Sequence, residues 1–145
     1  MKLIPVMLLA SSCVAMAACS KDTFETKPKI EITGYNTREL RTDQILSITM
    51  DYFDKEGDLG NGSVTAILDR QNISDANIPR AMELAYVLPE FPPRDKGEIV
   101  LRIPYESLEH TDFENDTFLL RVFVIDRASN ISDTVTTEQI VSVRP

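Results

Sequence analysis

The chain has 145 residues, 43% of them hydrophobic, and its 15 basic and 23 acidic side chains give a formal net charge of −8. Such an acidic chain does not attract nucleic acid or anionic lipid through its charge, although it can attract cations. It has no tryptophan, four tyrosines and six phenylalanines, which disfavours a flat aromatic platform for sugar stacking. The length suits one domain with its own hydrophobic core.

Residues 1–18 have the features of an export signal. Lys2 is their only charge, apolar and small residues fill positions 3–18, and Cys19 is followed at once by polar Ser20-Lys21-Asp22. This pattern resembles a bacterial lipoprotein signal peptide, which implies that residues 1–18 are removed and that Cys19 is acylated as the new N-terminus. Several alkyl tails, at roughly 0.8 kcal/mol per buried methylene, would then hold the chain at a membrane.

Three other interpretations of this segment remain open. A transmembrane helix needs about 20 apolar residues, and this run is shorter and contains Pro5. Cleavage after Ala17 would give ordinary secretion. Cys13 is an earlier acylation candidate, but apolar residues follow it. Met16 also stands where the lipoprotein pattern usually has leucine.

Ser20-Lys21-Asp22 resembles the acidic tag of Bacteroidota-type surface lipoproteins, which implies an outer-membrane, cell-surface location. The alternative is that these residues form a solvated tether.

Residues 19–28 read as a polar linker, and residues 29–145 as the folded domain. The linker reaches roughly 30 Å at ~3.3 Å per residue. Beyond it, apolar and polar side chains alternate with the period of two that is typical of half-buried strands. The seven predicted strands are Lys29–Tyr35, Gln44–Phe53, Ser63–Asp69, Arg80–Leu88, Glu98–Ile103, Thr117–Asp126 and Ser132–Val143.

Strands of this length, separated by turn signals and without a long helical pattern, predict an all-β fold. We expect an antiparallel immunoglobulin-like β-sandwich of about seven strands. Arg80–Leu88 is the ambiguous segment because it contains good helix formers, but Pro79 and Pro89 bracket it and its length suits a strand. Pro104–His110 predicts one short helical turn. Residues 29–145 contain no cysteine, so packing without disulfides must hold the domain together.

Two segments resemble bacterial immunoglobulin-like and cadherin-like domains. Valine-rich Asp116–Asp126, the turn Arg127–Asn130 and the following Thr/Val-rich segment are similar to their last hairpin. The loop Asp54–Gly60 resembles the D-x-D-G-D-L-G loop of lipoproteins of this kind. The resemblance spans about Lys29 to Val143 and implies a sandwich fold, and its short motifs are shared by domains of many functions. Phe118 and Ser129 depart from it, because a corner tyrosine and a turn glycine are usual there.

Asp54, Glu56 and Asp58 place three carboxylates within five residues. Anions this close repel one another unless solvent or a cation neutralises them, and calcium takes six to eight oxygen ligands. In a seven-strand sandwich the loop after the second strand and the last hairpin turn lie at the same end. Asp126 and Asn130 could therefore complete an oxygen cage, and calcium is the candidate cofactor.

The same loop has another interpretation. Asp, Gly and Asn also favour tight turns, so a plain hairpin turn remains open. An EF-hand is excluded, because Leu59 and Thr65 stand where that loop needs glycine and glutamate. Asp51, one strand pair earlier, could assist the cluster.

Phe91, beside Pro92 and Pro93, forms an apolar loop tip that is a candidate contact for a protein or glycan partner. The alternative is that its ring packs beneath its own loop. His110 is the only histidine. Without a thiol nucleophile, GxSxG or HExxH beside it, His110 makes no recognisable catalytic set.

The sequence thus predicts a non-catalytic binding or adhesion-type module that is anchored by lipid to the outer membrane. It predicts no enzyme and no nucleic-acid partner. The alternative is a structural spacer or a subunit of an outer-membrane complex with no ligand of its own. A hydrolase is a third hypothesis, and it lacks a catalytic constellation.

Overall fold

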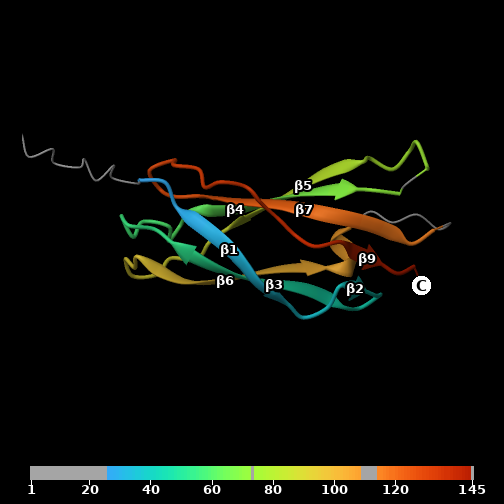
Figure 1. Ribbon diagram of the computed structural model, residues 1–145, viewed down its shortest axis with the longest axis horizontal. Coiled ribbons are helices and arrows are strands. Elements are labelled where there is room, and N and C mark those ends of the chain that lie inside the picture. The colour runs from blue at the N-terminus through green and yellow to red at the C-terminus, as the bar shows by residue number, and fades with distance from the viewer. Residues whose placement is uncertain (1–25, 73, 109–113, 145) are drawn as a thin grey trace, which may run out of the picture.

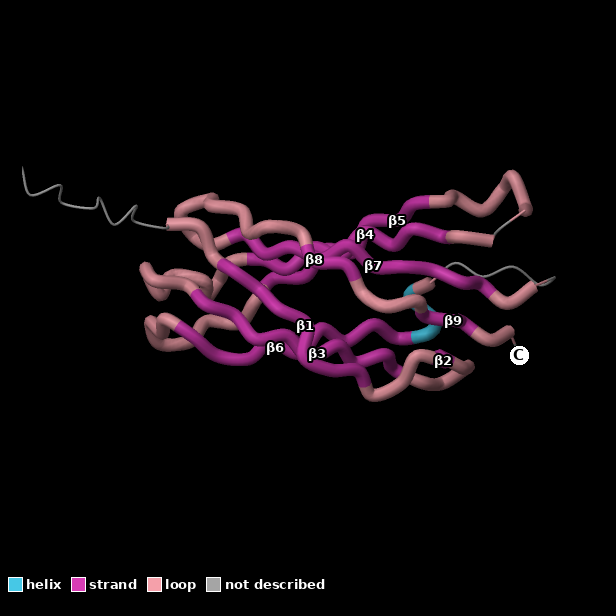
Figure 2. Tube along the Cα trace, in the orientation of Figure 1, coloured by secondary structure: helices cyan, strands magenta, loops and turns pink. Residues whose placement is uncertain are grey.

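The computed structural model describes residues 26–72, 74–108 and 114–144. In these residues two β-sheets pack face to face (Figures 1 and 2). One sheet has the order β1-β3-β6, and the other has the order β2-β9-β7-β4-β5 with β8 also paired to β7. The strands are β1 (Lys29–Tyr35), β2 (Glu39–Leu40), β3 (Ile45–Phe53), β4 (Ser63–Arg70), β5 (Ala81–Val87), β6 (Lys96–Pro104), β7 (Asp116–Ile125), β8 (Val135–Thr136) and β9 (Ile140–Ser142).

This architecture confirms the predicted all-β, immunoglobulin-like sandwich. Helix in the described part of the chain is limited to the 3-10 turn η1 (Tyr105–Ser107), within the predicted helical turn. No helix among the described residues is both long and apolar enough to cross a membrane. The ambiguous segment Arg80–Leu88 is a strand, β5, as predicted.

The core forms because the alternating side chains of both sheets face inward. On β3, Leu46, Ile48 and Met50 are fully buried, while Asp51 and Phe53 on the same strand are exposed. Burial of such side chains is the main favourable term in folding. The other fully buried apolar side chains belong to the same cluster: Leu40, Leu59, Ala66, Leu68, Ile103, Phe118, Leu120, Val122, Val124 and Ile140.

The last predicted strand, Ser132–Val143, is wrong as a continuous element. It splits into β8 and β9, and the hydroxyls of Ser132 and Thr137 accept hydrogen bonds from the N–H groups of Val124 (3.0 Å) and Leu120 (2.9 Å) on β7. In a continuous strand, backbone carbonyl groups would accept these two hydrogen bonds. Because the two hydroxyls accept them instead, the segment runs beside β7 without continuous backbone pairing. The short strand β2 lies between the predicted strands Lys29–Tyr35 and Gln44–Phe53, where no strand was predicted, and it pairs in parallel with β9.

The first strand of the sandwich begins beside the loop Asp54–Gly60, which carries the acidic residues. The antiparallel register of β1 and β3 pairs Lys29 with Phe53, the residue before Asp54. Just upstream, Pro28 is buried and Lys27 forms an ion pair with Asp133. The end of the expected linker therefore lies against the domain at the end that carries Asp54.

A buried ion pair lies at the other end of β4 and β7. The Arg70 Nε–H donates to Asp116 Oδ2 at 2.6 Å, and the two side chains are 0% and 1% exposed. A second Arg70 nitrogen donates to the Pro79 carbonyl at 2.7 Å. Sequence reasoning missed this pair, although both residues continue the inward phase of their strands: Arg70 follows Val64, Ala66 and Leu68, and Asp116 precedes Phe118.

Candidate metal centre

Three aspartates from two loops meet at one end of the sandwich. Asp54 follows β3, Asp58 lies four residues later in the same loop, and Asp126 follows β7. One carboxylate oxygen from each lies within 4.8 Å of the others. Because β3 and β7 belong to different sheets, the cluster joins the two layers of the fold. The structure confirms that these two loops meet at one end.

Backbone hydrogen bonds fix the position of Asp54. Its N–H donates to the Asp95 carbonyl at 2.7 Å, and the Gly57 N–H donates to the Asp54 carbonyl at 3.0 Å. The Glu56 N–H donates to Asp54 Oδ1 at 3.2 Å. Gly57 has φ +69°, a left-handed conformation that favours glycine. The second oxygen of Asp54, Oδ2, is buried and accepts no hydrogen bond from the described residues.

Asn130 holds Asp126 in place. The Asn130 backbone N–H donates to Asp126 Oδ1 at 2.8 Å, and the Asn130 side-chain amide donates to Asp126 Oδ2 at 2.9 Å. The turn closes with the Ser129 N–H donating to the Asp126 carbonyl at 3.1 Å. Asn130, which we expected to supply an oxygen ligand, thus orients the Asp126 carboxylate through its amide nitrogen.

The structure does not bring every predicted ligand together. Glu56 is exposed and lines a neighbouring pocket instead of joining the three aspartates. Asp51 is exposed on β3 and is also outside the cluster. Cys19 and His110 lie outside the described residues.

The cluster contains buried carboxylate oxygens without a hydrogen-bond partner. Asp54 Oδ2 and Asp58 Oδ1 are buried and accept no hydrogen bond from the described residues. Asp54 is 1% exposed and Asp126 is 4% exposed. A buried acceptor left unsatisfied costs about 1–3 kcal/mol, and more when it is charged. The repulsion among three close anions adds to this cost.

The pKa of Asp58 reflects this crowding. Burial raises the pKa of Asp58 above its ordinary value, and the neighbouring carboxylates of Asp126 and Asp54 raise it further. Hydrogen bonds from the backbone N–H groups of Ala128 and Asp58 itself act in the opposite direction. The two neighbouring carboxylates therefore favour an added positive charge near Asp58.

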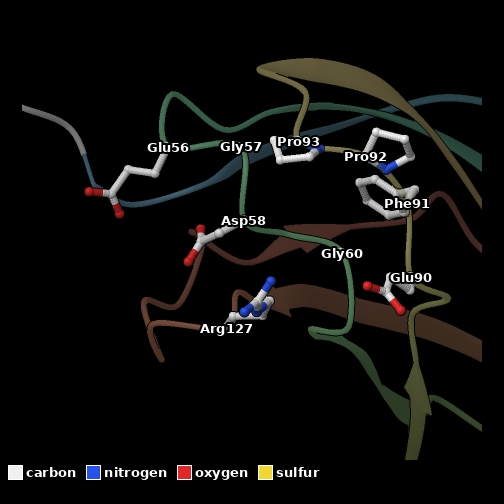
Figure 3. Close-up of a pocket in the computed structure, with 9 residues that line it drawn as sticks. All are labelled: Glu56, Gly57, Asp58, Gly60, Glu90, Phe91, Pro92, Pro93 and Arg127. Atoms are coloured by element: carbon white, nitrogen blue, oxygen red, sulfur yellow. The ribbon is translucent and has the colours of Figure 1, made fainter.

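A pocket of about 560 Å³ adjoins the cluster (Figure 3). Figure 3 shows Phe91 and Pro92 on one side of it and Asp58 and Arg127 on the other. Phe91 is half-buried, packs on the core and lies 6.0 Å from Tyr52 between ring centroids. Phe91 therefore packs inward and also forms part of the pocket wall. The remaining lining residues are Glu56, Gly57, Gly60, Glu90 and Pro93.

Comparison with known proteins gives no family. No family model matches the chain, and no curated protein matches it. Among solved structures, a β-glucosidase from Kluyveromyces marxianus in complex with glucose has a TM-score of 0.43 at 14% identity, covering 81% of this chain. This chain spans 15% of the length of that enzyme. A cohesin module from a family 33 glycoside hydrolase of Clostridium perfringens has a TM-score of 0.37 at 13% identity, covering 83% of this chain and 99% of the module.

Proposed function

We propose that this protein is a lipid-anchored, non-catalytic binding module of the outer membrane, displayed on the cell surface. We further propose that calcium at Asp54, Asp58 and Asp126 stabilises its loop end. The observation that carries the calcium proposal is the pair of buried, unpartnered oxygens, Asp54 Oδ2 and Asp58 Oδ1, beside a third carboxylate. The lipid anchor and surface location rest on the sequence around Cys19.

An oxygen-only donor set favours a hard cation. The described residues include no histidine or cysteine, the ligands that softer metals such as zinc prefer. Calcium accepts carboxylates in irregular geometry, whereas magnesium demands near-ideal octahedral geometry and keeps several waters. Three carboxylates on two irregular loops fit calcium better.

A bound cation would fix the loops that line the pocket. Asp58 belongs both to the cluster and to the pocket wall, and Arg127 follows Asp126 directly. The Arg127 N–H donates to the Asp58 carbonyl at 3.3 Å, which joins the two loops. Holding these loops would pre-organise the pocket for a protein or glycan partner, because less loop entropy would be lost on binding.

Thermal unfolding and calorimetric titration of the full chain test the calcium site. At a calcium concentration of about 100 times Kd, binding stabilises the folded state by about 2.7 kcal/mol, which raises Tm by about 10 °C for a domain of this size. Excess EGTA should reverse the shift. Unchanged melting at millimolar calcium, with no heat of binding, would refute the site.

Asp54→Asn gives the sharper test because, relative to wild type, its melting temperature should change in opposite directions without and with calcium. Without calcium the variant should melt at or above the wild-type temperature, because one charge leaves a repelling cluster. With calcium it should lose most of the stabilisation. Asp51→Asn is the matched control, since Asp51 is an exposed aspartate outside the cluster, and it should respond to calcium like wild type. Equal calcium responses in all three proteins would contradict the assignment.

Fractionation tests the anchor independently. Metabolic labelling with a fatty acid should mark the wild-type chain and not Cys19→Ala, and surface proteolysis of intact cells should remove the wild-type chain. Pull-down from outer membranes, together with a glycan and matrix screen, then distinguishes a binding module from a structural spacer. A spacer should co-purify with a neighbouring envelope protein yet show no ligand in a glycan or matrix screen.

A further inference from the structure

We propose that the outer edge of β5 pairs antiparallel with β5 of a second copy of this chain, with Leu84 on the two-fold axis. The six-stranded sheet would then continue across two molecules. This proposal does not depend on the calcium site or on the lipid anchor.

β5 is the last strand of its sheet and runs along one margin of the molecule (Figure 1). Among the described residues it pairs only with β4. It is seven residues long, has no register shift against β4, and has one charged side chain, Glu83. A long, regular edge with little charge is a template for pairing with another chain.

The other sheet edges carry the features that prevent such pairing. β6 has charged side chains at Lys96, Glu98 and Arg102. β1 has Lys29 and a register shift near Gly34. β2 and β8 are each two residues long. β5 is thus the least protected edge of the described structure.

The ladder to β4 shows which backbone groups of β5 point outward. The Arg70 N–H donates to the Arg80 carbonyl at 2.8 Å, and the Leu88 N–H donates to the Gly62 carbonyl at 2.9 Å. Because hydrogen-bonded pairs alternate along an antiparallel ladder, the even-numbered residues between them bond to β4. The odd-numbered residues direct their N–H and C=O groups outward: Ala81, Glu83, Ala85 and Val87.

The sequence around β5 is symmetric about Leu84. Pro79 and Pro89, which cannot donate to a ladder, stand five residues on either side of it. In the two-fold pair Glu83 faces Ala85 of the other copy, so the two Glu83 side chains are diagonal neighbours, and their repulsion is weaker than that of directly opposed acids. About eight hydrogen bonds would form from the outward groups of the two strands.

Charge also favours this register at both ends of the pair. Arg80 and Glu90 are exposed and flank β5 on opposite sides. With Leu84 on the axis, Arg80 of one copy faces Leu88 of the other and lies diagonal to its Glu90, within reach of long side chains. The half-buried Met82, Leu84 and Tyr86, which pack on the edge of the core, would also lose contact with water.

An edge-to-edge contact of this length buries less than about 1,000 Å² and therefore predicts a weak, reversible dimer. The net charge of −8 on each copy opposes association. Added salt should therefore strengthen the dimer by screening that repulsion.

Amide hydrogen exchange on the unmodified full chain tests the pairing. In detergent at a fixed, high detergent-to-protein ratio, raising the protein from about 0.1 mM to about 1 mM should slow exchange at Glu83 and Ala85 at least twofold. The N–H groups of Met82 and Leu84, already bonded to β4, are the internal control and should not change. Exchange at Glu83 and Ala85 that is independent of concentration would overturn the proposal.

Ala85→Pro supplies a second arm, because it removes an outward N–H and leaves the bonds to β4 intact. We expect it to be monomeric by sedimentation, with wild-type circular dichroism. Val100→Pro is the matched control: the Tyr105 N–H donates to the Gln44 carbonyl, so by the same alternation the Val100 N–H on β6 points outward. It should dimerise like wild type. Protection that requires another polypeptide from a membrane extract would refute a second copy as the occupant.

Discussion

Replacing Asp116 with asparagine should destabilise the domain strongly, because it leaves the Arg70 guanidinium charged and buried. The two side chains are 0% and 1% exposed and 2.6 Å apart, so solvent screening does not reduce the effect. Removing one partner of such a buried pair costs about 3–5 kcal/mol. The total stability of a domain is about 5–15 kcal/mol, so the variant should lose a large share of it.

The measurement is urea unfolding followed by circular dichroism, since the chain has no tryptophan. The double variant Arg70→Met/Asp116→Leu is the informative companion, because replacing both charges with apolar groups is often nearly neutral. It also loses the Arg70 hydrogen bond to the Pro79 carbonyl, so we expect it within about 2 kcal/mol of wild type. A loss below about 1 kcal/mol for Asp116→Asn would show that the charge is solvated in solution and would refute the reasoning.

Three further variants test packing and backbone conformation. Gly62→Ala should cost about 2 kcal/mol or more in urea unfolding, because its Cβ would lie 2.3 Å from the Ile125 carbonyl oxygen; Gly34→Ala, with open space around it, is the matched control and should stay close to wild type. Phe118→Ala should cost about 3–5 kcal/mol in the same assay, because Phe118 is 0% exposed in the core; a loss below about 1 kcal/mol would mean that the core repacks. Ser129→Gly should raise Tm in EGTA by a few degrees, because Ser129 has φ 71° and glycine tolerates that conformation better; a lowered Tm would mean that the serine side chain compensates the strain.

Alternation of apolar and polar residues was enough to predict most of the fold. Segments such as Gln44–Phe53 carry one buried face each, and the structure buries that face. The division of Ser132–Val143 could not be predicted this way. The period of two in this segment is the same whether its backbone carbonyls or the hydroxyls of Ser132 and Thr137 accept hydrogen bonds from the N–H groups of β7.

The aspartate cluster could be predicted better from topology than from composition. Because the loop after β3 and the last hairpin were expected to meet, Asp54, Glu56, Asp58, Asp126 and Asn130 were predicted to lie together, and the structure groups the carboxylates of Asp54, Asp58 and Asp126. Composition alone could not separate Asp58 from Glu56 in the same loop, because the turn decides which carboxylate faces inward. Composition also could not show that the side-chain amide of Asn130 donates a hydrogen bond to Asp126.

The placement of the two ends of the described chain has a mechanical consequence. The blue start of β1 and the red end of the chain lie at opposite ends of the long axis (Figure 1). A pulling force that enters near residue 26 and leaves near residue 144 would run parallel to the strands. The ladder between β1 and β3 would then be loaded in shear, so that its hydrogen bonds resist together and do not break one by one as in a zipper. Such a domain would keep its fold under tension applied between its two ends.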